Sequence, residues 1–162
     1  MVLRVRSVTM EDLPRCAAIE EICFPAAQAA SRQTIEARIR SYPGHILAGV
    51  YEDEIVGYVM GPVIDRLYIE DEMFADTACH SEENPYQAVF ALAVVPAFQR
   101  RGIGGQLLHA MVELARKEGR RAVTLTCLQE KIRFYEALGF VNHGISASVH
   151  GGVQWYNMVR EL

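Results

Sequence analysis

The stretch YQAVFALAVVPAFQRRGIGG, residues 86–105, decides the fold of this chain. Residues 88–95 carry no charged side chain, which predicts a strand buried on both faces, and Pro96 ends it because proline has no N–H to donate. Residues 99–104 form a basic, glycine-spaced turn before an amphipathic helix predicted over 102–118. The free N–H groups and the positive dipole end of that helix would face the turn, so a phosphate or pyrophosphate would fit there.

Strand and helix patterns alternate through the rest of the chain. Thr9 and Asp12 resemble a capping box at the start of the first helix, and Gly139 stops the last one. Residues 65–85 are acidic and show no clear period, so a short helix and a loop near a site are expected there. In chain order we predict a strand over 2–8, helices over 9–22 and 31–42, strands over 45–51, 55–64 and 88–95, a helix over 102–118, a strand over 121–127, a helix over 130–138, and strands over 140–146 and 153–160.

The predicted helix over 102–118 lies between two predicted strands, and this determines the sheet type. A helical crossover of this kind connects parallel strands, whereas the short connections elsewhere suit antiparallel pairs. We therefore expect an α/β fold with a mixed, mostly antiparallel sheet and one parallel βαβ step. A length of 162 residues suits a single domain over 1–162.

Composition excludes several classes of function. The formal net charge of -4 disfavours a general nucleic-acid surface, which needs a positive field. The beginning of the chain lacks an apolar signal region, and the longest apolar run is too short to cross a bilayer, so we expect a cytoplasmic protein without membrane contact. The cysteines form no C-x-x-C pair and match no histidine spacing, which predicts reduced thiols and no metal site; they are Cys16, Cys23, Cys79 and Cys127.

The glycine-spaced turn limits the choice of ligand. Gly102 and Gly104 would allow close approach of a ligand, and Arg100 and Arg101 would add charged donors. No Gly-Lys-Ser/Thr follows, and the first glycine of a dinucleotide-binding fingerprint is missing, so nucleoside triphosphates and NAD are disfavoured. Taken alone, the pattern is also compatible with a plain connection between a strand and a helix.

Two motifs together resemble the GNAT superfamily of acetyl-CoA-dependent N-acetyltransferases. The Q/R-x-x-G-x-G/A signature of that family has its counterpart in Gln99, Gly102 and Gly104, after the Leu92–Val94 strand end. Residues 132–140, IRFYEALGF, look like the family's FY-x-x-x-GF segment. The resemblance implies a GNAT-type sheet with helices on both faces and acetyl-CoA as co-substrate, without a metal.

Within this superfamily, the chain is most similar to the arylalkylamine, or serotonin, N-acetyltransferase branch. The Cys23–Pro25 loop and the segment Phe90–Val94 carry that similarity. The branch has two histidines just before its Ala-Leu-Ala-Val strand, and this chain has Ala88 and Phe90 instead. The proton path of the branch therefore does not transfer directly to this sequence.

The resemblance also implies roles for individual residues. Tyr135 matches the family's general acid, which would protonate the departing CoA thiolate; its alternative reading is a core tyrosine. Phe24 and Pro25 would form an apolar wall for the substrate, and the Val94 N–H would polarise the thioester carbonyl. The residues expected to bind acetyl-CoA, through the pantetheine or the pyrophosphate, are Leu92, Ala93, Val94, Gln99, Arg100, Arg101, Gly102, Ile103, Gly104, Gly105 and Phe134.

The general base is left open by the sequence. An amine with a pKa near 10 is only about one part in a thousand neutral at pH 7, a deficit of roughly 4 kcal/mol, so a group must accept its proton. The candidates are His80, Glu82, Glu83, Glu21, or water alone. His45, His143 and His150 rank below them, and His109 should face away on the long helix.

The sequence predicts direct acetyl transfer to a primary amine of a small molecule through a ternary complex. Cys127 is the rival nucleophile, but no histidine lies near it in the sequence. A protein or peptide acetyltransferase and a non-catalytic CoA-binding module are the alternatives. Both a monomer and a homodimer are compatible with the sequence.

Overall fold

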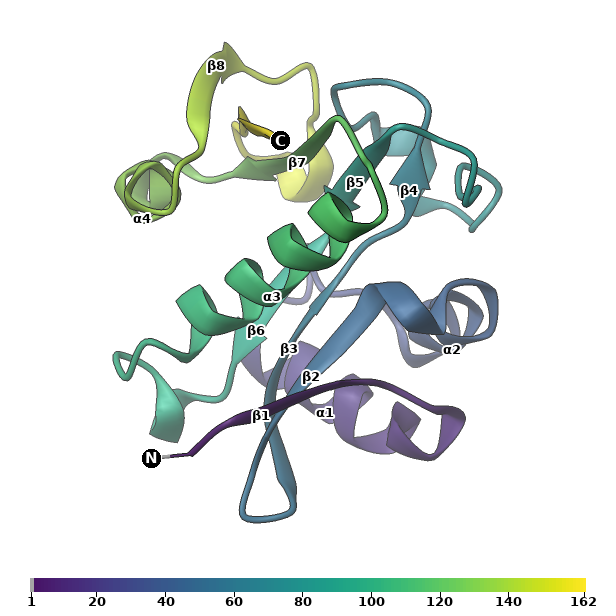
Figure 1. Ribbon diagram of the computed structural model, residues 1–162, viewed down its shortest axis with the longest axis vertical. Coiled ribbons are helices and arrows are strands. Elements are labelled where there is room, and N and C mark those ends of the chain that lie inside the picture. Colours follow the sequence, from purple (N-terminus) through teal and green to yellow (C-terminus); the bar gives the residue numbers. More distant parts are fainter. Residues whose placement is uncertain (1) are drawn as a thin grey trace.

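Two sheets form the framework of the protein, for which a computed structural model describes residues 2–162 (Figure 1). The first sheet has the strand order β1-β2-β3-β6, and all its pairs are antiparallel. Its strands are β1 (Arg4–Ser7), β2 (Ile46–Tyr51), β3 (Glu54–Met60) and β6 (Ala91–Val94). The β2–β3 connection at residues 52–53 closes a hairpin, and both of its residues have positive φ.

The second sheet contains the parallel pair that the sequence predicts. Its order is β4-β5-β7-β9-β8, and β5 runs parallel to β7 with Tyr86 opposite Ala122. The other pairs are antiparallel. Its strands are β4 (Val63–Ile64), β5 (Tyr86–Val89), β7 (Ala122–Cys127), β8 (Val141–Ile145) and β9 (Tyr156–Glu161).

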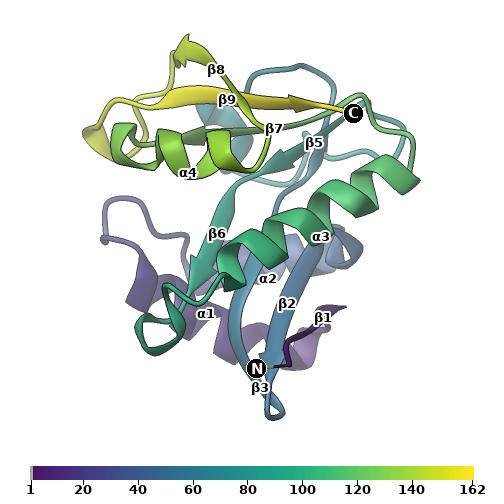
Figure 2. The same ribbon diagram turned by 60° about the vertical axis from the view of Figure 1, so that its left-hand side comes forward.

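Helices cover both faces of the first sheet (Figure 2). The long helix α3 (Ile103–Lys117) packs on β2, β3 and β6, while α1 (Leu13–Cys23) packs on β3 and β6 from the opposite side, beside α2 (Arg32–Ser41). The short α4 (Ile132–Ala137) lies against β8 and β9. This mixed sheet with helices on both faces confirms the predicted fold class.

The main difference from the sequence prediction lies at Phe90. The single strand predicted over 88–95 is two strands, β5 and β6, which belong to different sheets. The Phe90 N–H donates to the Met60 carbonyl at 2.8 Å, while Val89 still pairs with Leu125 of β7. The chain therefore changes sheets at this residue, and within residues 2–162 no strand pairs with the second edge of β6.

A second predicted strand, over 55–64, is also divided. It becomes β3 and β4, with Gly61 and Pro62 between them. A Cβ at Gly61 would lie 1.9 Å from the Ala88 carbonyl oxygen, so only glycine permits this approach of two backbones. The other predicted elements are present with ends shifted by a few residues, and residues 65–85 contain only the short 3-10 helix Asp71–Phe74.

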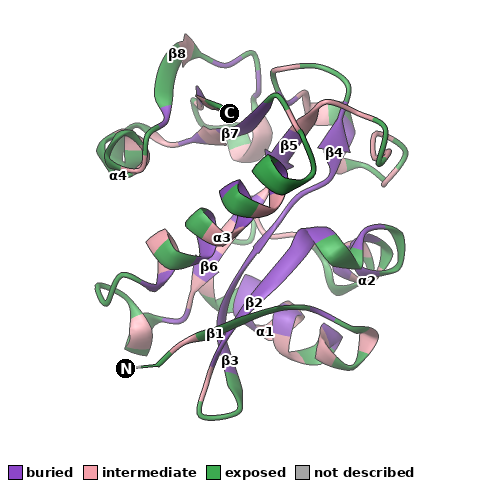
Figure 3. Ribbon diagram, in the orientation of Figure 1, coloured by how far each residue is buried: buried purple, intermediate pink, exposed green. Residues whose placement is uncertain are grey.

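The core lies between α3, the first sheet and α1, where β2 and β3 are buried along most of their length (Figure 3). Six side chains of α3 are buried on the face that packs on the sheet: Ile103, Leu107, Leu108, Met111, Val112 and Ala115. By contrast, α4 has no fully buried residue, and its aromatic side chains remain available for a ligand. No helix within residues 2–162 combines the length and hydrophobicity that a membrane span requires.

Candidate active site

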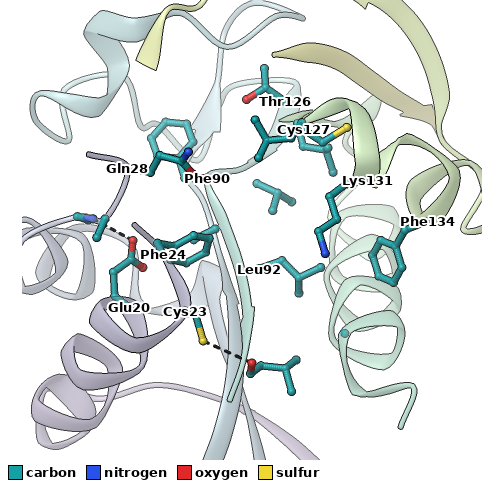
Figure 4. Close-up of a pocket in the computed structure, with 18 of the residues that line it drawn as sticks. Glu20, Cys23, Phe24, Gln28, Phe90, Leu92, Thr126, Cys127, Lys131 and Phe134 are labelled. Atoms are coloured by element: carbon teal, nitrogen blue, oxygen red, sulfur yellow. Dashed lines mark hydrogen bonds between the residues drawn. The ribbon is translucent and has the colours of Figure 1, made fainter. Parts of the chain in front are cut away.

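A cavity of about 820 Å³ opens where the two sheets separate. Its walls come from α1 on one side and from α3 and the α4 region on the other, and β6 forms its floor (Figure 4). Among the residues expected to bind acetyl-CoA, all but Ala93 and Arg101 line it. Phe24, Pro25 and Tyr135 line it as well.

The backbone of β6 presents to this cavity groups that β3 does not pair, and of these the Val94 carbonyl accepts from side chains. The Val95 N–H donates to the Val56 carbonyl at 2.9 Å, and Ala93 stands opposite Tyr58. Because backbone groups in an antiparallel pair point alternately to either side, Leu92 and Val94 direct theirs to the open edge. Ala93 instead points to β3 and is buried, so its expected contact with the cofactor is not supported by its position.

The turn before α3 has the geometry of an anion site. Arg100 and Gly102 have positive φ values of 63° and 79°, and the first-turn N–H groups of α3 face the turn. The Gln99 side chain donates from Nε2 to the Val94 carbonyl oxygen at 2.9 Å, which fixes the turn to the end of β6. Arg101 differs from the expectation, because its guanidinium lies 5.1 Å from the Phe98 ring centroid and outside the cavity.

The opposite wall carries Phe134 and Tyr135 on α4 and Lys131 just before it. The Phe134 ring faces α3, where a Cβ on Gly104 would lie 3.5 Å from its Cζ atom. The Lys131 side chain extends towards Leu92 and adds a cation beside the glycine turn (Figure 4). Burial raises the pKa of Tyr135, so its phenol keeps its proton over the physiological pH range.

Two cavity cysteines are held as thiols. Burial raises the pKa of Cys127 to about 11. Burial also raises the pKa of Cys23, whose Sγ donates to the Val94 carbonyl oxygen at 3.4 Å. A nucleophilic cysteine needs the thiolate, so neither environment favours an acyl-cysteine.

The far end of the cavity is enclosed by two loops that contact each other. His150 Nε2 donates to the Gln28 carbonyl oxygen at 3.1 Å, which links the C-terminal loop to the segment after α1. A neutral imidazole that donates from Nε2 has an unprotonated Nδ1. Trp155, Phe74 and Phe90 add aromatic surface to this end of the cavity. We call this region the acceptor end.

Asp71 holds the C-terminal loop in place. Its carboxylate accepts hydrogen bonds from Ser148 Oγ at 2.5 Å and from the Val149 N–H at 3.0 Å. Burial alone would raise the pKa of Asp71, but these two hydrogen bonds and the nearby His150 outweigh burial and lower it. The 65–85 segment thus supports the acceptor end from behind.

The sequence analysis named Glu21 as a candidate for the general base, but its neighbour Glu20 is the acidic residue of α1 that lines the cavity. The Glu20 side chain lines the cavity and is only 3% exposed, whereas Glu21 is exposed on the outer face of α1. Its carboxylate accepts from the Ala30 N–H at 2.9 Å and from the Tyr58 hydroxyl. Both carboxylate oxygens of Glu20 therefore already accept hydrogen bonds, which connect α1 to β3 and to the residues just before α2.

The other base candidates lie outside the cavity. His80 and Glu82 join His45 in a separate cluster whose ligand-type atoms lie within 4.8 Å of one another. His80 Nδ1 accepts from the Val63 N–H at 3.0 Å, so the neutral ring carries its proton on Nε2. A protonated Nε2 cannot ligate a metal, so this hydrogen-bonded ring does not present a lone pair to an ion. Glu83 is exposed and does not line the cavity either.

Several cavity residues escaped the sequence analysis, namely Glu20, Gln28, Arg38, Lys131 and Trp155, and it ranked His150 low among the candidates for the general base. They come from segments without a recognisable motif. A period of 3.6 residues could have placed Arg38 on the inner face of its helix, since it lies three residues after Ile35 and one before Ile39. Loop residues such as His150 carry no comparable signal.

Comparison with known proteins agrees with this geometry. A model of the acetyltransferase (GNAT) family matches residues 10–140, and the chain belongs to this family of acyltransferase enzymes. Among curated proteins, none matches the sequence significantly.

Solved structures share the fold at low sequence identity. The loading GNATL domain of CurA from Lyngbya majuscula superimposes with a TM-score of 0.86 at 18% identity, covering 99% of this chain and 98% of that one. The GphF GNAT-like decarboxylase in complex with isobutyryl-CoA gives 0.85 at 21%, covering 98% of each chain. The ribosomal-protein-S18-alanine N-acetyltransferase from Escherichia coli gives 0.74 at 19%, covering 99% and 94%.

Proposed function

We propose that residues 1–162 act as one acetyl-CoA-dependent N-acetyltransferase domain that transfers the acetyl group directly to a primary amine of a small molecule. The observation that carries this proposal is the open edge of β6 beside the glycine turn. The Leu92 N–H and carbonyl and the Val94 N–H would pair with the pantetheine amides, as an added strand pairs with a sheet edge. The first turn of α3, with Arg100 and Lys131, would bind the pyrophosphate.

In this binding mode the thioester lies near the break between β5 and β6. The backbone N–H of the open edge next to this break, that of Leu92, would polarise the thioester carbonyl and stabilise the oxyanion. Val94, which the family pattern named for this role, lies at the other end of β6, beside the glycine turn. The neutral amine attacks the carbonyl carbon, the tetrahedral intermediate collapses, and the C–S bond breaks. Tyr135 would donate its proton to the departing thiolate, which its raised pKa supports.

The proton of the ammonium group needs an acceptor at the acceptor end. We assign this role to His150, because in its neutral form the ring that donates from Nε2 to the Gln28 carbonyl has an Nδ1 able to accept a proton. Glu20 is the other ionisable candidate in this wall, but both its oxygens already accept hydrogen bonds from Ala30 and Tyr58. His150 would thus replace the histidines that the arylalkylamine branch carries where this chain has Ala88 and Phe90.

A small-molecule acceptor is supported by the contact between His150 and Gln28. This contact bridges the two loops over the acceptor end, whereas a peptide substrate needs an open groove there. The aromatic walls formed by Phe24, Phe74 and Phe90 favour an amine with an apolar or aromatic body. These features support an arylalkylamine-like acceptor.

The test is a panel of amines with acetyl-CoA, followed by release of the CoA thiol. The panel contains aromatic and aliphatic small amines and peptides with free N-termini or lysines. We expect thiol release with small amines and little with peptides, and a lower kcat in a His150→Gln variant. Preferred turnover of peptides would contradict the small-molecule assignment.

A second candidate is decarboxylation of an acyl-CoA that carries a carboxylate. GphF, a protein of the same fold, is a GNAT-like decarboxylase. The observation that favours it here is the buried cation Arg38 in the cavity wall, which no acidic residue within residues 2–162 neutralises through an ion pair. In such a reaction a malonyl-type thioester takes up one proton and yields carbon dioxide and the shortened acyl-CoA. Carbon dioxide release from malonyl-CoA without any amine tests this candidate.

A further inference from the structure

Arg38 is a buried arginine in the wall of the cavity, and it is the starting point of this inference. It lies on α2 and is only 6% exposed, whereas Arg32 and Arg40 of the same helix face solvent. Arg40 pairs with Glu36 at 3.5 Å on that outer face. The sequence thus places one cation of this helix inside the protein and the others outside.

The Arg38 guanidinium has no anionic partner. Its NH1 atom lies 3.6 Å from the Met60 Sδ atom, and its central carbon lies 5.2 Å from the Phe90 ring centroid. Within residues 2–162 no carboxylate forms an ion pair with it, and Met60 is its single side-chain hydrogen-bond acceptor. A thioether and an aromatic face compensate only weakly for the water that a buried guanidinium has lost.

Two other shielded arginines of the same protein have oxygen acceptors. Arg120, with a side chain 9% exposed, donates to the carbonyl oxygens of Glu82 and Asn84 and pairs with the carboxylates of Glu82 and Glu118. Arg160 donates to the Leu138 carbonyl oxygen at 2.8 Å. The lack of an oxygen acceptor at Arg38 within residues 2–162 therefore distinguishes this arginine of the cavity wall from Arg120 and Arg160.

Arg38 lies beside the break between β5 and β6, where the proposed function places the thioester. Met60 stands opposite Ala91, and its carbonyl accepts from the Phe90 N–H at 2.8 Å, so the two contacts of Arg38 lie at the break where the open edge of β6 begins. If the thioester lies at this break, as the proposed function requires, Arg38 faces the acyl group and the acceptor. A guanidinium binds a planar carboxylate through two parallel hydrogen bonds.

We propose that Arg38 binds a carboxylate group of the substrate, which makes the substrate a carboxylate-bearing molecule. This inference rests on the proposed function only for the position of the thioester. The carboxylate has two possible sources, an amino-acid acceptor or a carboxylated acyl group on CoA. Glu20, on the neighbouring helix and in the same cavity, is not within ion-pair distance of Arg38, so the wall offers separate positive and negative groups to a ligand.

Matched pairs of compounds that differ by one carboxylate test this proposal. For the acceptor source, acetyl transfer to phenylalanine is compared with transfer to phenethylamine, and transfer to β-alanine with transfer to propylamine. For the acyl source, the dissociation constant of malonyl-CoA is compared with that of butyryl-CoA by calorimetry. We expect a preference of about tenfold or more for the carboxylated member in one of the two sources, which identifies that source.

The variants are Arg38→Met, which removes the charge and keeps an unbranched apolar chain, and Arg40→Met as the exposed control on the same helix. In Arg38→Met the preference should fall to about one, while the affinity for acetyl-CoA stays unchanged. Arg40→Met should keep the preference. No preference in either source for the wild type, or a preference that survives in Arg38→Met, would overturn the proposal.

Stability offers a readout that does not depend on turnover. Because Arg38 lacks an anionic partner, Arg38→Met should melt at a higher temperature than the wild type without ligand, whereas loss of a structural arginine would lower the melting temperature. Adding the preferred carboxylate should raise the melting temperature of the wild type and not of the variant. A lower melting temperature of the free variant would count against the inference. Failure of the wild type to bind acetyl-CoA would instead refute the proposed function.

Discussion

The imidazole of His150 stacks on the ring of Phe74, with ring centroids 4.9 Å apart and an interplanar angle of 25°. Phe74 belongs to the 65–85 segment and His150 to the C-terminal loop, so two segments far apart in the sequence meet over the acceptor end. Asp71 strengthens this junction through its hydrogen bonds to Ser148 and Val149. The position of His150 therefore depends on Phe74 inside the cavity and also on Asp71, which does not itself line it.

The first prediction concerns this support. Asp71→Asn weakens the hydrogen bonds to Ser148 and Val149, and we expect a higher KM for the amine and a lower kcat, with unchanged acetyl-CoA affinity. Glu72→Gln, at an exposed neighbouring position, is the control and should behave as the wild type. Because the folded pKa of Asp71 is lowered, the support is present above pH 4 and is lost only as pH falls further through that folded pKa. An equal effect of both variants on amine kinetics would contradict this role.

The second prediction concerns Tyr135. Tyr135→Phe should lower kcat by about 100-fold, the lower range for loss of a general acid, while calorimetry shows unchanged acetyl-CoA binding. Since burial raises the pKa of this phenol, the wild type should show no loss of activity between pH 8 and about pH 10 that depends on Tyr135. A variant with wild-type kcat would remove Tyr135 as the proton donor.

The third prediction concerns the cavity thiols. With the pKa of Cys127 raised to about 11, less than about one part in a thousand is thiolate at pH 7.5, so Cys127→Ala should retain most of its activity. Mass spectrometry of enzyme mixed with acetyl-CoA alone should show no added acetyl group. Accumulation of an acetylated Cys127, together with inactivity of a folded Cys127→Ala variant, would indicate an acyl-enzyme.

The fourth prediction separates cofactor binding from folding. In Gly104→Ala the new methyl group would lie 3.5 Å from Phe134 Cζ and 3.9 Å from Val94 Cγ2, which are ordinary contacts. Alanine also favours a helix over glycine by up to about 1 kcal/mol, so the free energy of unfolding should not fall. The methyl group would occupy the pyrophosphate cradle, and the dissociation constant of CoA should rise about tenfold. Gly44→Ala is the control, and unchanged CoA affinity in Gly104→Ala would argue against the cradle.

The fifth prediction concerns the cluster of His45, His80 and Glu82. Burial lowers the pKa of His80 below 6.5, so the unfolded chain binds this proton more tightly than the folded one. The resulting contribution to stability is complete above pH 6.5 and declines as pH falls below it. His80→Asn, which can still accept from the Val63 N–H, should lose less stability between pH 7.5 and pH 5.5 in urea unfolding. His109→Asn, an exposed control on α3, should follow the wild type.

The order of elements and the parallel βαβ step could be predicted because each depends on local patterns. The capping box at Thr9 forms as expected, with its N–H donating to Asp12 Oδ2 at 2.8 Å, and Ser31 caps α2 through the Thr34 N–H. The change of sheet at Phe90 could not be predicted. An uninterrupted apolar run is compatible with one long strand or two short ones, and only the pairing with Met60 and Leu125 decides between them.

The candidate site divides in the same way. The residues expected to bind the cofactor could be predicted, because they belong to two short motifs whose residues are close together in the sequence. The acceptor end combines residues from α1, α2, the 65–85 segment and the C-terminal loop. Glu20 and Glu21 differ by about 100° around the helix axis, and the apolar residues of α1 do not define a single face that would choose between them.

The unpaired edge of β6 has a consequence for the protein when CoA is scarce. The Leu92 N–H and carbonyl and the Val94 N–H are then available to any extended segment, including β6 of a second molecule. Cofactor occupancy would therefore protect the chain against self-association. We expect the unliganded protein to aggregate faster on mild heating than the CoA complex, in proportion to the fraction of molecules with an empty edge.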